Sequence, residues 1–316
     1  MRTLLIFISI ALGCLTYAQQ DIQLTNFESG EAIFNPATIS NTKFICGNIA
    51  GRNQWSQFGG NPNTALINIY GKLDNHNFVG FQILTDAIGF QNSNFIKLSY
   101  AYKFYLQKTS ISIGLNANVF HSKWGGNFIT PDTPQSLDDA IPDNTFSATK
   151  FDMDAGIYIK NGPLYMGLST SHLNQSNFSQ PGIIGFQSKR HYFIHAGWEE
   201  RRSWGSIEPK ILAKSDVAST QLDFQIQSQL NYKYIVGLNY RISDAISPMI
   251  GVNLTNGIGS FKFIYAYDIT TSKLRNYSKG THELTLNICF SKTINRERYT
   301  NPRNLGNYDF GPRGKW

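Results

Sequence analysis

Two histidines, His191 and His195, have the type and spacing that most suggest metal binding in this chain. On a helix, a spacing of four residues places two side chains on one face, about one turn apart. The stretch from Lys189 to Trp198 instead predicts a strand, on which the two rings lie about 13 Å apart along the chain. That distance is too long for one ion. We therefore predict interior-facing structural roles for both histidines, beside Phe193.

Other residues that could do chemistry lack the partners that this chemistry needs. Four aspartates, among prolines in the stretch 122–149, lack the alternating oxygen ligands and central glycine of a calcium loop. Ser169 and Ser171 precede His172, but the sequence has no Gly-x-Ser-x-Gly, no phosphate-binding glycine loop and no paired-cysteine zinc pattern. We expect no enzyme activity, no cofactor and no metal. The aspartates are Asp132, Asp138, Asp139 and Asp143.

The dominant pattern of the chain is an alternation of apolar and polar residues. In the stretch 221–230, Phe224 and Ile226 share one side of an extended strand with two leucines, while Asp223 and four glutamines share the other. The glutamine-lined side is too polar for a packed core. An apolar side opposite it suits a wall between lipid and water, and this predicts a strand of a transmembrane β-barrel.

About fourteen such segments follow one another, so we predict an all-β, up-and-down antiparallel barrel. Connections after every second strand are short, and most others are longer, notably 122–149, 173–188 and 270–281. Outer-membrane barrels show this asymmetry, with the short turns in the periplasm, and an even strand number places both termini there. A soluble lipocalin-like barrel also alternates, but fourteen strands enclose more space than side chains fill. The segments are roughly 43–54, 63–73, 76–86, 94–106, 109–121, 150–160, 163–172, 189–199, 206–215, 219–230, 233–242, 245–255, 260–269 and 282–292.

The N-terminal part of the chain differs from the barrel, which we assign to residues 43–292. Residues 1–18 predict a signal peptide, with Arg2, an apolar run and a small-x-small-like cleavage site. Residues 19–42 suit an irregular periplasmic or plug-like segment, because Pro36 lacks a backbone donor and breaks strand pairing. We expect this segment to fill part of a polar, closed lumen. The lumen-facing residues expected to contact Asn, Asp and aromatic side chains inside are Lys97, Lys103, Gln225, Gln227 and Arg241.

The C-terminal tail, residues 293–316, is basic, with five Lys or Arg residues against two acids. The many acids of the barrel segment offset most of its bases, so a uniformly basic nucleic-acid binder is not expected. We expect the tail to lie in the periplasm, where basic and aromatic side chains suit docking on a protein partner. A solvated extension is the alternative. The expected partner-binding residues are Arg296, Arg298, Tyr299, Arg303, Tyr308, Phe310, Arg313, Lys315 and Trp316.

Two cysteines, Cys46 and Cys289, lie on the first and last predicted strands. These strands are neighbours once the barrel closes, and strand parity places both thiols on the lumen side. A disulfide across this seam is compatible with an oxidising periplasm, but it needs matching strand register. Two free buried thiols are the alternative.

Several blocks of the sequence resemble the PorP/SprF family of outer-membrane proteins associated with the type IX secretion system of Bacteroidetes. The blocks are Gln19-Gln20-Asp21, Phe34-Asn35-Pro36-Ala37, Arg52-x-Gln54-Trp55, Gly59, Pro62-x-Thr64, Tyr100-Ala101-Tyr102-Lys103, Tyr265-Ala266-Tyr267-Asp268-Ile269-Thr270-Thr271-Ser272-Lys273-Leu274 and Gly280-x-His282-Glu283. The chain departs from the family at Asp21-Ile22, where Asp-Pro is usual, and at Thr38-Ile39-Ser40, where Tyr-Ala-Gly is usual.

The resemblance implies a non-enzymatic component of a secretion system in the outer membrane. Family members support export or surface attachment of secreted proteins and adhesins, some linked to gliding motility. Expected partners are C-terminal domains of such cargo, periplasmic or peptidoglycan-associated components, and outer-membrane lipid. Loops 122–149 and 270–281 are the expected cargo-facing surface, with Tyr267, Lys273 and Tyr277 as its first candidates. A porin or substrate-specific channel is the alternative, which the polar lumen fits equally well.

Overall fold

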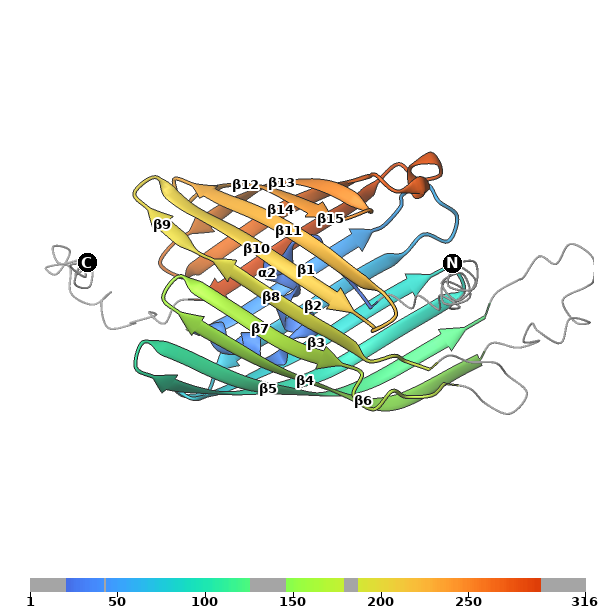
Figure 1. The fold of residues 1–316 in the computed structure, drawn as a ribbon, viewed down its shortest axis with the longest axis horizontal. Helices are drawn as coiled ribbons and strands as arrows, with labels where there is room; N and C mark the ends of the chain where they lie inside the picture. The colour runs from blue at the N-terminus through green and yellow to red at the C-terminus, as the bar shows by residue number, and fades with distance from the viewer. Residues whose placement is uncertain (1–20, 43, 126–145, 179–186, 291–316) are drawn as a thin grey trace, which may run out of the picture.

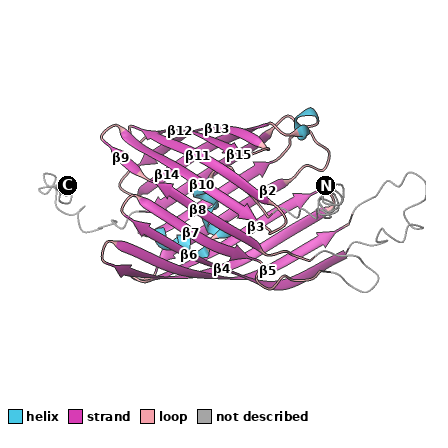
Figure 2. Ribbon diagram, in the orientation of Figure 1, coloured by secondary structure: helices cyan, strands magenta, loops and turns pink. Residues whose placement is uncertain are grey.

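A computed structural model describes residues 21–42, 44–125, 146–178 and 187–290, and shows a closed antiparallel β-barrel with a short helical segment inside it (Figures 1 and 2). The internal segment contains helix α2 (Phe27–Phe34) and the 3-10 helix η1 (Pro36–Asn41). The wall is formed by β1 (Ile45–Asn53), β2 (Asn63–Lys72), β3 (Asn77–Ile88), β4 (Gln91–Leu106), β5 (Thr109–Trp124), β6 (Phe146–Asn161), β7 (Leu164–Ser171), β8 (His191–Trp198), β9 (Glu200–Arg202), β10 (Gly205–Ser215), β11 (Thr220–Leu230), β12 (Tyr234–Arg241), β13 (Ala245–Thr255), β14 (Gly259–Thr270) and β15 (Thr281–Phe290), with a 3-10 helix η3 (Lys273–Asn276) before the last strand.

The wall closes because β1 pairs with β15. Every other strand pairs with the strands before and after it in the chain, except that β8 and β9 do not pair with each other. Both β8 and β9 pair with β10, so β9 continues β8 across a break. The break lies opposite Pro209, which has no N–H for the ladder. Counted in this way the wall has fourteen strands, and the predicted fold is confirmed.

The predicted alternation corresponds to the two sides of this wall. On β11, Phe224 and Ile226 expose 43% and 46% of their surface, whereas Asp223 and Gln225 expose 1% and 2%. The apolar side chains therefore point outward around the barrel and the polar ones point into the lumen, as a membrane barrel requires. Among the described residues, no helix is both long and apolar enough to cross a membrane.

The two ends of the barrel differ in their connections. We call the end with the β4–β5, β6–β7 and β11–β12 turns the short-turn end, and the opposite one the long-loop end. Asp21 lies at the long-loop end, where it accepts a hydrogen bond from Ser171 at the end of β7. Phe290 ends β15 at the short-turn end, opposite Gly259. Asp21 and Phe290, the first and last described residues, therefore lie at opposite ends of the barrel, because the segment before β1 runs through the lumen; the two chain ends lie outside the described residues.

The seam between β1 and β15 carries a covalent link. Cys46 and Cys289 are register partners with Cα atoms 4.1 Å apart, and their sulfurs form a disulfide. The link spans 243 residues, so in an unfolded chain it would close a loop that contains nearly the whole barrel. A cross-link of this kind stabilises mainly by restricting the unfolded chain.

We predict that Cys46→Ser and Cys289→Ser each lower the free energy of unfolding by about 2–4 kcal/mol, because each removes the cross-link. The double variant should lose no more than either single one, since the second substitution has no bond left to break. Urea denaturation of the barrel in lipid vesicles measures all three. Additive losses would show that the two thiols act independently.

Candidate functional site

The internal segment, residues 21–42, is called the plug here. Its helix α2 ends at Asn35 because the residue before a proline avoids the helical conformation. Pro36 then begins η1, and the Asn35 side-chain oxygen accepts a hydrogen bond from the Ala37 N–H at 3.0 Å. Sixteen of the 22 plug residues are buried, so the barrel wall surrounds a filled lumen.

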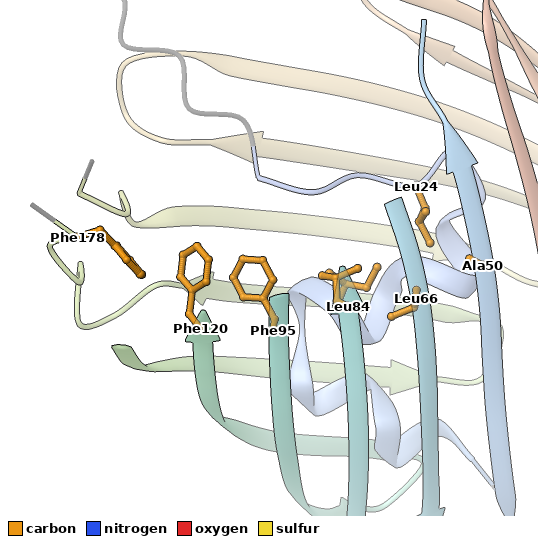
Figure 3. Packing of buried hydrophobic residues seen from close by; sticks show 8 residues of the cluster. Leu24, Ala50, Leu66, Leu84, Phe95, Phe120 and Phe178 are labelled. Carbon is orange, nitrogen blue, oxygen red and sulfur yellow. The ribbon is translucent and has the colours of Figure 1, made fainter. Parts of the chain in front are cut away.

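Apolar contacts hold the plug against the first strands of the wall. Leu24 faces a row of lumen-side residues that come from successive strands (Figure 3). Farther along the plug, Phe27 and Phe34 pack against Phe193 of β8 and Leu212 of β10. These contacts fix the plug's height in the barrel without directional bonds. The row consists of Ala50, Leu66, Leu84, Phe95 and Phe120, followed by Phe178 from the loop after β7.

Three glycines, Gly114 on β5, Gly156 on β6 and Gly167 on β7, form a groove for the Asn35–Ala37 turn. A Cβ at Gly114 would lie 2.5 Å from the Pro36 carbonyl carbon, and one at Gly167 would lie 2.6 Å from the side-chain nitrogen Nδ2 of Asn35. In this groove, Asn35 Nδ2 donates to the Ile157 carbonyl at 3.1 Å. Side chains at these glycines would push the turn off the wall, so the groove is specific for the Asn-Pro-Ala turn.

A buried charge cluster holds the start of the plug against the seam. Arg52 on β1 lies 2.7 Å from Asp268 on β14 and 2.9 Å from Glu283 on β15, and these side chains are almost completely buried. The Glu283 carboxylate also accepts the backbone N–H groups of Thr25 and Asn26, at 2.6 and 2.8 Å. The cluster therefore joins the first strand, the last two strands and the plug.

Other lumen charges extend this network around the wall. Arg241 pairs with Asp223 at 3.1 Å and with Asp268 at 3.4 Å. Lys97 pairs with Asp154 at 2.9 Å and donates to the plug carbonyl of Ile33 at 3.2 Å.

The remaining lumen side chains singled out in the sequence also have partners inside the barrel. Lys103 donates to the plug carbonyl of Ser40, and its ammonium lies over the Phe78 ring. Gln227 donates to Glu28 of the plug, and Gln225 donates to the Met249 sulfur. Lys97 and Arg241 thus contact aspartates and Lys103 contacts an aromatic ring, as predicted, whereas Gln225 and Gln227 contact a methionine and a glutamate instead.

His172, directly after β7, is held between two carboxylates at the long-loop end. Burial disfavours the charged ring, but hydrogen bonds to Asp152 and Asp21 outweigh that cost and raise the pKa of His172 to about 10. The ring is therefore charged at neutral pH and attracts Asp21 at the start of the plug. Next to it, Asp21, Arg52, Trp55, Asp86 and Arg241 help to line an open cavity of about 400 Å³.

The expected cargo-facing residues lie on and beside the loop before β15. Tyr277 is 71% exposed and Lys273 is exposed on η3, whereas the Tyr267 hydroxyl is bonded to the Lys279 carbonyl at 2.8 Å. Backbone hydrogen bonds of 2.7 and 2.9 Å link this loop to Ser56 in the first loop. Residues 126–145 of the other expected loop, the signal peptide and the whole partner-binding tail lie outside the described residues.

The two histidines singled out first both line the lumen. His195 Nε2 lies 3.1 Å from Asn35 Nδ2 of the plug. His191 is also buried, four residues earlier on the same strand. Within the described ranges, no group of three or more His, Cys, Asp or Glu side chains is arranged to hold a metal ion.

Sequence reasoning did not single out the charge cluster as a site, although its members lie in the blocks quoted above. Arg52 begins one block, Asp268 lies in the longest and Glu283 ends the last. The alternation of inward and outward residues along each strand could have found them. It places each of these charged residues on the lumen side of a strand at or next to the closing seam. Their common partner, Thr25, carried no such signal.

Comparison with known proteins identifies the family of this fold. The family model for the type IX secretion system membrane protein PorP/SprF matches residues 16–288. No curated protein matches the sequence.

Among solved structures, the chain is similar to the toluene transporter TbuX of Ralstonia pickettii, with 10% identity and a TM-score of 0.49 over 83% of this chain and 92% of that one. A FadL homologue of Pseudomonas aeruginosa matches with 9% identity and a TM-score of 0.49, over 81% and 92% of the two chains. The outer-membrane protein Omp33 of Acinetobacter baumannii matches with 7% identity and a TM-score of 0.43, over 77% and 96%.

We predict that Gly114→Ala displaces the plug and raises ion conductance in planar lipid bilayers above the wild-type level. The added methyl group would meet backbone atoms of Pro36 and Ala37, which cannot rotate away as a side chain can. Gly51→Ala is the matched control, because a Cβ there meets no atom within 4 Å. If both variants conduct like the wild type, the glycine groove does not hold the plug.

We predict that Glu283→Gln lowers the free energy of unfolding by about 3 kcal/mol, because it leaves Arg52 buried with one fewer charged partner. Amide hydrogen exchange should also become faster at Thr25 and Asn26, whose N–H groups lose the carboxylate. Glu199→Gln is the control, since its pair with Arg201 is exposed to solvent and contributes about 0–1 kcal/mol. Equal losses in the two variants would contradict a special role for the cluster.

Proposed function

Because this chain belongs to the PorP/SprF family of type IX secretion system membrane proteins, we propose that it is an accessory or anchoring barrel of that system in the outer membrane. In this role it supports export or surface attachment of secreted proteins or adhesins, including those used in gliding, and it catalyses no reaction. The short-turn end then faces the periplasm and the long-loop end faces the cell surface.

The observation that best supports this role over a pore is the filled lumen. The plug is held by an apolar row, a glycine groove and a buried charge cluster, so it is a built part of the fold. An open porin would leave a water-filled channel through the barrel instead. The polar lumen wall still favours a channel as the second candidate, for a state in which the plug leaves.

The proposal assigns the two ends of the barrel to different partners. On the surface side, the loop with Lys273 and Tyr277 lies beside the cavity of about 400 Å³. The loop and the cavity offer contacts to cargo such as the C-terminal domain of an adhesin. On the periplasmic side, the tail from Lys292 to Trp316 offers Arg, Tyr and Trp anchors to a periplasmic or peptidoglycan-associated component.

A test replaces the gene in the native bacterium with an allele that stops after Lys292. The barrel should still assemble, because β15 is complete at Phe290. Recovery of a periplasmic partner with the tagged barrel should fail, and surface proteomics should show loss of a defined set of secreted proteins. The full-length allele is the control.

A complete gene deletion separates the two candidate functions. Loss of surface cargo with unchanged uptake of small solutes supports the secretion role. Unchanged cargo display in the deletion strain would overturn it, and unchanged partner recovery from the truncated protein would overturn docking by the tail.

A further inference from the structure

A recess of about 800 Å³ opens at the short-turn end of the barrel, on the side of the wall formed by β9 to β14. Figure 1 shows β9 at the left of the barrel, away from the long loops. The recess is lined by Arg201 of β9, Ser206 of β10 and residues in and beside the β11–β12 and β13–β14 turns. Lys262 at its inner side pairs with Glu28 of the plug at 2.5 Å. It therefore leads from the barrel rim to the plug.

Cations outnumber carboxylates in the recess. Its lining contains Arg201, Lys233 and Lys262 against a single acid, Glu199. Glu199 is already shared between Arg201 at 2.5 Å and Lys160 at 3.7 Å. Lys233 stacks over the Tyr234 ring at 5.3 Å and forms no salt bridge within the described part of the chain. Since Lys262 is paired with Glu28, the positive charge left over in the recess is that of Lys233, beside Arg201 and Lys160, which share one carboxylate.

The rim of the recess is held in place before any partner binds. The Tyr232 hydroxyl donates to the Arg202 carbonyl at 2.7 Å, and the Asn231 N–H donates to the Trp204 carbonyl at 2.7 Å. The Asn253 N–H donates to the Lys233 carbonyl, also at 2.7 Å, so the β9–β10, β11–β12 and β13–β14 turns are tied together.

The middle turn is a tight hairpin turn. Asn231 and Tyr232 have φ angles of 49° and 55°, and the Lys233 N–H donates to the Leu230 carbonyl at 2.9 Å. This is the turn conformation that fits the twist of two paired strands. A surface held rigid in this way loses little conformational entropy when a ligand binds.

We propose that this recess is a docking site for an extended acidic segment of a periplasmic protein. The assignment rests on the proposed function, because that function places the short-turn end in the periplasm. The charge of the recess favours an acidic occupant over the chain's own tail, which follows β15 at this end. From residue 292 onward the tail carries six Lys or Arg residues and two acids, so the basic recess repels it. A carboxylate-rich segment would bring partners to Lys233 and Arg201 and reach Lys262 beside the plug.

The test measures binding of a short fluorescent peptide of alternating Glu and Ser to the purified full-length barrel in lipid nanodiscs, by fluorescence anisotropy. The Glu peptide should bind, and a peptide with Gln at the same positions should not. The double variant Arg201→Gln, Lys233→Gln should weaken binding about tenfold, and added salt should weaken wild-type binding, because the site is open to solvent.

The matched control is Lys72→Gln, Lys108→Gln, which removes two exposed lysines from the same end of the barrel outside the recess. It keeps the basic tail and changes the net charge equally, so it should bind the Glu peptide as the wild type does. Equal weakening in the two double variants, or equal binding of the Gln peptide, would overturn the site. Either result would leave the secretion role standing, because cargo display in the deletion strain is measured without the peptide.

Discussion

The rest of the structure depends on the Arg52 guanidinium, which lies out of water between Asp268 and Glu283. Burying three charges costs several kcal/mol per ion, and only good geometry with extra hydrogen bonds offsets it. Those extra bonds come from Thr25 and Asn26 of the plug. A cluster of this kind adds little net stability. Its three charged groups have all their partners only when the β1–β15 seam and the plug are in place together. It therefore couples closure of the wall to filling of the lumen.

The plug runs along the lumen before the chain enters the wall. It begins near Ser171 at the long-loop end, yet the strand that follows it, β1, begins at the short-turn end. In the closed barrel, β1 and β15 therefore pair around a segment that runs the length of the lumen. The glycines at 114, 156 and 167 allow this, because their bare backbone leaves space for the Asn35–Ala37 turn to approach three strands at once. The disulfide between Cys46 and Cys289 then holds the closed seam.

Alternation was sufficient to place most wall strands, because a barrel strand shows its two environments in every pair of residues. The predicted segment 219–230, for example, differs from β11 by one residue. The segment 189–199 was less accurate, since Pro209 on the neighbouring strand splits its pairing between β8 and β9. Parity also placed Lys97 and Arg241 in the lumen, but it could not choose their partners. Arg52 and Asp268 are 216 residues apart, and only closure of the barrel brings them together. The direction of the plug could not be predicted either, because no local pattern in residues 21–42 indicates at which end of the barrel the segment begins.

The two sides of the plug are held by different forces, and this determines where the filled lumen is easiest to loosen. Toward β1–β8 the contacts are the apolar row, Phe193 and the glycine groove, which lose free energy as soon as water enters. Toward β11–β15 they are hydrogen bonds and ion pairs, such as Ser29 to Asn287 and Glu28 to Lys262. Water can replace such bonds at a small net cost, about 1 kcal/mol each, provided that no charge is left buried and unpaired. Separation of the plug from the wall should therefore begin at Glu28, whose pair with Lys262 is partly exposed, and not at Thr25 and Asn26, which hydrogen-bond the buried Glu283 carboxylate. The recess that ends at Lys262 lies on this same side, so a ligand there would act where the plug is least costly to hydrate, while Asn35 stays in its groove.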